Sequence, residues 1–228
     1  PLTQTGSNLN ISGGSLTSNE VPFIQTLALS SGTWTANGAS TVRVLTQSGG
    51  NLAGTGTVQG LAVTHSVNGS LSPGDSGGAG LGTLQLQGSL VLGSASTSLF
   101  TIGDPTLTYD KLLGTTPLTS MTLDGYFTIT APTFGGSYTP QSGDVWDLID
   151  WASIVGIGTS FNVGSNLRTA GDGGGDLFLP DVSLYSLGWD VSDFGNGRIS
   201  LALIPEPSRM MLIFFGLLGL CFRRRRHE

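Results

Sequence analysis

Short runs of alternating apolar and polar residues fill the first half of the chain. In residues 84–87 leucines alternate with glutamines, and Val42 and Val44 enclose Arg43. Side chains of a β-strand point to opposite faces in turn, so a period of two predicts half-buried strands. Turn signals such as Asn68-Gly69 recur between these runs and leave no room for long helices.

Strands this short cannot each bury enough apolar surface alone. If successive turns of the chain stack on one another, their inward side chains form one continuous core and the Gly, Asn and Ser positions occupy the corners. The pattern therefore predicts an all-β fold in which residues 1–104 form a β-solenoid.

Residues 105–204 are also β-rich but less regular. Strands are predicted at residues 106–113, 121–125, 126–131 and 145–151. Asn196-Gly197, which lies between apolar runs at 187–191 and 199–203, predicts a hairpin. We expect this part to continue the solenoid and to cap its open end with aromatic side chains.

A repeat-like segment spans residues 49–102. It resembles the autotransporter-associated β-strand repeat of bacterial surface proteins, and that resemblance implies a right-handed parallel β-helix. The residues that carry it are Gly49, Gly50, Leu52, 54–58, 71–74, 82–84 and 90–93. Residues 75–81 depart from the pattern, because they lengthen the turn after Pro73-Gly74.

Composition narrows the class further. The chain has 36 glycines without a period of three, which excludes collagen, and only 11% charged residues, which argues against a disordered polyampholyte or a coiled coil. Cys221 is the single cysteine, so an intrachain disulfide and a cysteine metal site are excluded. Cys221 lies in an apolar segment, where a cysteine more commonly packs against its neighbours. Lipidation of Cys221 is the alternative.

Charge is divided between an acidic body and a basic tail. Residues 1–204 carry 13 acidic and four basic groups, Arg43, Lys111, Arg168 and Arg198, whereas the whole chain has a net charge of −6. An acidic body does not attract phosphate backbones, so we expect no nucleic-acid partner.

The tail has three parts in a fixed order. Pro205-Glu206-Pro207 ends the last strand, because proline cannot donate to a ladder. An uninterrupted run of apolar residues and glycine follows at 210–222, and Arg223, Arg224, Arg225 and Arg226 come directly after it. As a helix that run spans about 20 Å, shorter than a hydrocarbon core of about 30 Å.

We expect the run to form one short membrane helix rather than a buried core helix, since a core helix needs no arginine anchor. The apolar side chains that would face lipid are Met210, Leu212, Ile213, Phe214, Phe215, Leu217, Leu218, Leu220 and Phe222. Snorkelling arginines, Arg209 among them, lengthen such a span. The positive-inside rule places the four consecutive arginines in the cytoplasm and the acidic body outside.

This tripartite end resembles the PEP-CTERM sorting domain. The resemblance implies that Pro205, Glu206 and Pro207 are recognised by exosortase, a membrane sorting enzyme associated with exopolysaccharide production, and that the tail is removed or kept as an anchor. It implies a cell-envelope protein, released to the surface or matrix after processing. Because the chain begins at Pro1 without Met, we expect a fragment or processed form and draw nothing from the missing signal peptide.

One motif, with one histidine upstream of it, could carry hydrolytic chemistry. Gly74-Asp75-Ser76-Gly77-Gly78 matches the pentapeptide around a serine-protease nucleophile. That site needs a base, and the single upstream histidine, His65, is too close along the chain, so we expect a glycine-rich corner. His65 shares the alternation of Leu61 and Val63, which predicts a half-buried structural histidine.

Acidic residues offer two further candidates. On one strand Asp147 would face away from Asp144 and Asp150, and that outer pair would lie about 20 Å apart, too far for acid–base work on one bond. Asp172 and Asp176, in a glycine-rich loop, could bind Ca²⁺ loosely.

The favoured function is a non-catalytic surface or matrix protein, structural or adhesin-like, with no catalytic residues, no cofactor and no metal. One alternative is a carbohydrate-active β-helix enzyme, which predicts carboxylates within about 10 Å in a groove. Another is a carbohydrate-binding module, which predicts that several tryptophans are exposed in one plane rather than packed in the core or cap. The candidates are Trp34, Trp146, Trp151 and Trp189.

Overall fold

The computed structural model describes residues 7–19, 21–59, 64–74, 81–107, 109–115 and 120–204. Their secondary structure is β apart from two short 3₁₀ turns, and it forms one large sheet of parallel strands and one small antiparallel sheet. The expectation of an all-β fold with stacked parallel strands is confirmed.

Three long strands begin the stack. They are β1 (Ser7–Ser18), β2 (Val21–Ala36) and β3 (Ala39–Gln47), and each pairs in parallel with the next. β2 contacts two later strands at different points along its length, β3 through its first half and β4 (Asn51–Gly54) through Thr33 to Thr35. A single strand thus runs along more than one face of the solenoid.

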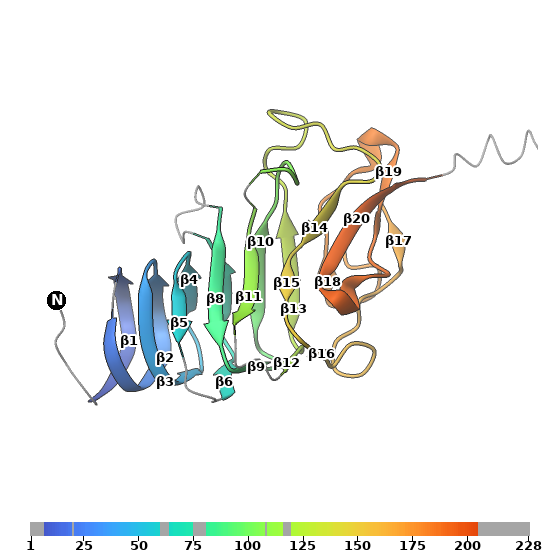
Figure 1. Cartoon of the computed structure of the whole chain (residues 1–228). Coiled ribbons are helices and arrows are strands. Elements are labelled where there is room, and N and C mark those ends of the chain that lie inside the picture. Colours follow the sequence, from blue (N-terminus) through green and yellow to red (C-terminus); the bar gives the residue numbers. More distant parts are fainter. Residues whose placement is uncertain are drawn as a thin grey trace, which may run out of the picture.

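Beyond these strands the parallel pairs sort into three ladders, and within each ladder the strands follow one another along the stack toward the C-terminal end (Figure 1). The first ladder stacks β3, β5 (Thr57–Gln59), β8 (Thr83–Gln87), β11 (Lys111–Thr115) and β15 (Ile149–Asp150). The second stacks β3, β6 (Thr64–Val67), β9 (Ser89–Leu92), β12 (Met121–Thr122) and β16 (Ile154–Val155). The third stacks β2, β4, β7 (Ser70–Pro73), β10 (Thr97–Thr101), β13 (Tyr126–Thr130) and β18 (Leu177–Phe178).

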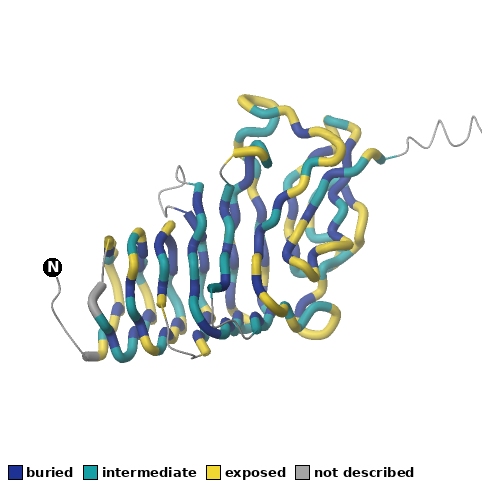
Figure 2. Tube along the Cα trace, in the orientation of Figure 1, coloured by how far each residue is buried: buried dark blue, intermediate teal, exposed yellow. Residues whose placement is uncertain are grey.

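The core runs along the axis of the stack. In the third ladder the residues aligned in register and pointing inward are Trp34, Leu52, Leu71, Ser98, Phe127 and Leu177, all of them buried. Along each of these strands, buried positions alternate with less buried ones, as Figure 2 shows. Each buried large apolar side chain contributes about 1.5–3 kcal/mol, so stability accumulates turn by turn.

Glycines allow the turns to stack closely at one corner. Gly32 and Gly50 have positive φ, +80° and +71°, and a Cβ on either one would lie about 2.5 Å from a backbone oxygen of the preceding turn. A side chain at these positions would push the turns apart as well as strain the backbone.

An antiparallel sheet closes the C-terminal end. Its strands, in spatial order, are β14 (Val145–Asp147), β20 (Arg198–Leu203), β19 (Leu187–Asp190) and β17 (Leu167–Arg168). The 3₁₀ turns η1 (Ser183–Tyr185) and η2 (Phe194–Asn196) lie next to its strands in the chain. Phe127 of the stack contacts Phe161 and Phe194, whereas Trp146 contacts Trp189, so aromatic rings fill the space between stack and cap.

The strand predictions had mixed outcomes. The hairpin at Asn196-Gly197 is confirmed, because β19 and β20 pair antiparallel around it. The strand at 106–113 is wrong in its first half: the Asp104 carboxylate accepts hydrogen bonds from the backbone and hydroxyl of Thr106 and forms a turn, so the strand begins at Lys111. The strand at 145–151 is divided at Leu148 into β14 and β15, which belong to different sheets.

No helix in the described ranges has the length and apolar character of a membrane span. The run expected to form one, 210–222, lies outside the described residues.

Candidate functional site

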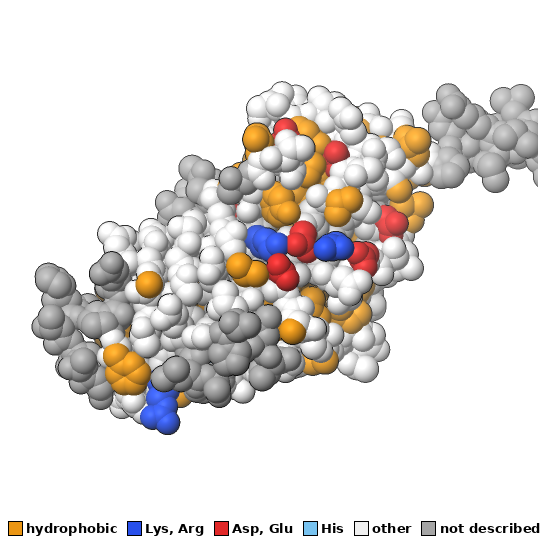
Figure 3. Space-filling view, viewed as in Figure 1, with side chains coloured by type: hydrophobic (Ala, Val, Ile, Leu, Met, Phe, Trp, Pro, Cys, Tyr) orange, Lys and Arg blue, Asp and Glu red, His pale blue; other side chains and the backbone are white. Residues whose placement is uncertain are grey.

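A cluster of charged side chains lies where the stack meets the cap. Lys111 comes from β11 and Asp150 from β15, both in the first ladder, whereas Asp147 and Arg198 come from β14 and β20 of the cap sheet. In Figure 3 basic and acidic side chains lie next to one another in the middle of the face shown, and further acidic side chains lie toward the cap. We call these four residues the junction cluster.

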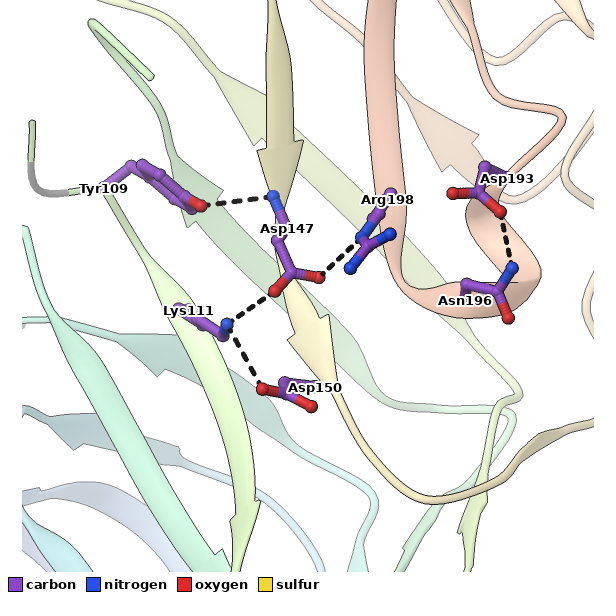
Figure 4. A network of polar contacts seen from close by, with 7 residues as sticks. All are labelled: Tyr109, Lys111, Asp147, Asp150, Asp193, Asn196 and Arg198. Carbon is purple, nitrogen blue, oxygen red and sulfur yellow. Dashed lines mark hydrogen bonds and ion pairs between the residues drawn. The ribbon is translucent and has the colours of Figure 1, made fainter. Parts of the chain in front are cut away.

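Lys111 is the centre of the junction cluster (Figure 4). Its Nζ lies 2.6 Å from Asp147 Oδ2 and 3.4 Å from Asp150 Oδ2. The other Asp147 oxygen lies 3.4 Å from Arg198 Nε, and the Asp147 backbone N–H donates to the Tyr109 hydroxyl at 3.2 Å. Asp147 therefore holds one cation from each of the two sheets.

The break at Leu148 builds this arrangement. The Leu148 N–H donates to Gly197 O of the cap at 2.9 Å, while the Leu148 carbonyl accepts from Leu112 N of the stack at 2.8 Å. The chain thus changes sheets at this residue, and the strict alternation of a strand is lost. The expectation that Asp147 and Asp150 face opposite ways is wrong, because it assumed one continuous strand.

The charge of Lys111 is stabilised by its partners. Burial is the largest influence and lowers the pKa of the ammonium, but the hydrogen bond and charge of Asp147, together with Asp150, raise the pKa above its usual value. The resulting stability is present below the pKa of an unfolded lysine, about 10.4, and is lost as the pH rises through the higher folded pKa.

The junction cluster also limits the chemistry available. Asp147 and Asp150 both contact one ammonium and so lie well within the about 10 Å that a glycosidase pair spans. That ammonium occupies the space between the two carboxylates. The arrangement is suited to joining the stack to the cap, because each charge already has an opposite partner.

Asp110, next to Lys111 in the chain, points inward and is buried. Its carboxylate accepts from Gly82 N at 3.1 Å and from Thr101 N at 2.7 Å. Burial raises its pKa to about 6, although these hydrogen bonds act in the opposite direction.

His65 is fully buried, deeper than the half-buried position expected from the sequence. Its Nδ1 accepts from Leu45 N at 3.3 Å, and its Nε2 lies 2.9 Å from Gln87 O, so the neutral ring with a proton on Nε2 satisfies both contacts. Burial lowers its pKa, although the contact with Gln87 acts in the opposite direction. The ring joins three turns of the stack and is not accessible to a substrate. Residues 75–78 of the serine-protease match lie outside the described residues.

The acidic loop candidates make internal contacts. Asp172 Oδ1 accepts from Gly174 N at 3.0 Å, and Asp176 Oδ2 accepts from Asn162 N at 2.8 Å. Arg168, which is buried, donates to the backbone carbonyls of this region. Those carbonyls belong to Val163, Ser165, Gly171 and Leu177. Across the described part of the chain, no three His, Cys, Asp or Glu side chains come together to hold a metal ion.

The tryptophans do not form an exposed binding plane. Trp34, Trp146 and Trp189 are fully buried, and Trp151 is 9% exposed. The indole N–H groups of the first three donate to Ser18 Oγ, Gly103 O and Pro180 O. The expectation that these tryptophans pack in the core or cap, rather than forming an exposed plane, is confirmed.

Comparison with known proteins identifies the tail. Residues 203–226 match the family model of the PEP-CTERM protein-sorting motif. This chain carries a PEP-CTERM sorting motif. The PEP-CTERM match implies that the protein is exported, associated with the cell envelope and sorted by an exosortase. No curated protein and no solved structure matches the chain.

The PEP-CTERM match begins at Leu203, the last residue of β20. The folded cap therefore leads directly into the sorting motif, of which Leu203 and Ile204 are described. Pro205, Glu206, Pro207, the apolar run and the four arginines lie outside the described residues. The autotransporter-associated repeat expected at 49–102 is not supported by a family match and stays a prediction.

Sequence reasoning missed the junction cluster. The signal that could have indicated it is Lys111, the single lysine of the chain, placed on a strand in an acidic body. Its partners could not have been found from spacing, because they come from two sheets whose pairing depends on the break at Leu148.

Proposed function

We propose that this chain is a non-catalytic cell-surface or matrix protein, structural or adhesin-like, that an exosortase-type system delivers through the PEP-CTERM tail. The observation that carries the proposal is the continuous core of parallel turns, sealed by an aromatic cap whose last strand leads into the sorting motif. Such a body is an elongated rigid element. The four charged side chains of the junction cluster form ion pairs with one another. This supports a role as a spacer or adhesive surface.

The tail gives the proposal its topology. We propose that residues 210–222 cross the membrane, with Arg223 to Arg226 in the cytoplasm and the acidic body outside. Because the apolar run is shorter than a hydrocarbon core, removal of the tail during sorting fits its length better than permanent anchoring. We propose that the released body lies in a matrix of exopolysaccharide.

Intact mass of the protein from its native host, measured after cell fractionation, tests this proposal. We expect an envelope or extracellular species that has lost the residues after about 207, because the sorting motif at 205–207 precedes the segment that would be removed. A variant with alanine at Pro205, Glu206 and Pro207 keeps the full tail and stays in the inner membrane, whereas Ser208→Ala, the matched control, is processed normally. An intact wild-type chain in the cytosol would refute the proposal.

A carbohydrate-active enzyme is the second candidate, and the proximity of Asp147 and Asp150 is the observation that favours it. Glycoside hydrolysis needs one protonated acid and a sugar between the carboxylates, where Lys111 lies here. We expect no release of reducing ends from polysaccharides by the wild type. Release that disappears in Asp147→Asn, but persists in the distant variant Asp181→Asn, would establish the enzyme instead.

A further inference from the structure

The outward face of the third ladder carries no charge at its described positions in β4, β7, β10, β13 and β18. One outward row follows the register from Asn51 through Ser70 and Thr97 to Tyr126. A second row contains Leu99, Thr128 and Phe178. The first ladder is different, because it contributes Lys111 and Asp150 to the junction cluster.

Two aromatic rings are exposed at the C-terminal end of this face. Tyr126 is 49% exposed and Phe178 is 37% exposed, and their ring centroids lie 6.2 Å apart at an angle of 58°. Leu99, 40% exposed, lies two residues along β10 from Thr97, the register partner of Tyr126. Thr97 and Thr128 are half-buried, and the register places Thr97 next to Tyr126 and Thr128 next to Phe178.

We propose that this face, defined by Leu99, Tyr126, Thr97, Thr128 and Phe178, binds a neutral polysaccharide. Sugar rings present apolar C–H faces bordered by hydroxyls, which match exposed aromatic rings bordered by threonine hydroxyls. The absence of charge from the described face suits a neutral rather than an acidic polymer. The inference rests on the proposed surface or matrix role, since that role supplies the ligand.

A second copy of the chain is a weaker occupant. A stable interface between copies needs about 800 Å² per partner with an apolar centre. Here the apolar part consists of three side chains among hydroxyls. A polymer chain needs less area at any one point, because it gains affinity by contacting successive turns of the stack.

Affinity electrophoresis of the full chain tests the proposal. The protein is kept in solution by a polyoxyethylene detergent, which has no sugar headgroup, in gels containing dextran, galactomannan or hydroxyethylcellulose. An alginate gel is the acidic comparison. Tyr126→Ala and Phe178→Ala remove the rings, Thr128→Val removes a hydroxyl at constant shape, and Val155→Ala changes an exposed apolar residue of the second ladder as the control.

We expect retardation in at least one neutral gel and weaker retardation in alginate. The dissociation constant should rise about two- to tenfold with each ring removed and further in the double variant, with no change in Val155→Ala. Circular dichroism melting checks that the variants are folded.

Three results would overturn the proposal: no retardation in any neutral gel, equal retardation of the wild type and the double ring variant, or a concentration-dependent dimer that the ring variants abolish. The last result would make this face a contact between copies. None of them affects tail processing, so failure of this proposal is distinguishable from failure of the proposed function.

Discussion

At the scale of single residues, His65 makes the stability of the stack depend on pH. Its pKa is lowered by burial, so below about pH 6.5 the unfolded chain binds a proton that the folded chain refuses. The free energy of unfolding should therefore fall as the pH decreases from 7 to 5. In His65→Gln this part of the slope should disappear, although the variant is less stable at every pH. Urea unfolding curves across this range measure both effects.

Asp110 acts in the opposite direction over an overlapping range. Its folded pKa is raised to about 6, so it retains a proton that the unfolded chain has released, and its contribution to stability declines as the pH rises from 4 to 6. The comparison of wild type with His65→Gln cancels this contribution, because Asp110 is present in both. Parallel profiles of the two proteins would contradict the role assigned to His65.

Asp110→Asn provides a separate test of the buried carboxylate. One amide oxygen can accept from Gly82 N or Thr101 N, but the amide N–H₂ then faces the other donor. We expect a loss of about 1–3 kcal/mol of stability at pH 7 and the disappearance of the decline between pH 4 and 6. Unfolding free energies at pH 4, 5, 6 and 7 give the result, and an unchanged stability at pH 7 would mean that relief of the buried charge offsets the lost hydrogen bond.

At the scale of elements, Lys111 and Asp147 join β11 of the stack to β14 of the cap. Both side chains are less than one-third exposed, and their contact is the shortest ion pair of the junction cluster. A double-mutant cycle with Lys111→Met and Asp147→Asn should give a coupling energy of about 1 kcal/mol that decreases at high salt. The Arg198–Asp147 cycle is the comparison and should give less, because Arg198 is more exposed and its contact is 3.4 Å long. Equal coupling in both cycles would contradict a dominant Lys111 contact.

Much of the element pattern could be predicted from the sequence. The alternation at residues 84–87 indicated β8, and Asn196-Gly197 indicated the hairpin of β19 and β20, since both signals are local. The division of 145–151 could not be predicted, because it depends on Gly197 O, which binds Leu148 N across about fifty positions of sequence. The proximity of Tyr126 and Phe178 could not be predicted either, because it arises from the register of β13 with β18, which are far apart in the sequence.

At the scale of the whole molecule, stability should vary along the axis. Each turn of the stack contacts mainly its neighbours, so a cavity made at one end should loosen that end before the other. Trp189 fills the cap and Trp34 fills the N-terminal turns, and both are fully buried and hydrogen-bonded through the indole. Replacing either tryptophan by alanine should cost about 3–5 kcal/mol locally.

Hydrogen exchange measured segment by segment distinguishes a local loss of stability from a global one. In Trp189→Ala we expect faster exchange in β14, β17, β19 and β20, with β2 to β5 protected as in the wild type. In Trp34→Ala we expect faster exchange in β2 to β5, with the cap strands protected as in the wild type. The aromatic contacts of Phe127 with Phe161 and Phe194 set the boundary, because they carry the loss of cap packing into β13. Uniform loss of protection in both variants would mean that stack and cap unfold as one unit, and the junction cluster and these rings would then be the contacts that couple them.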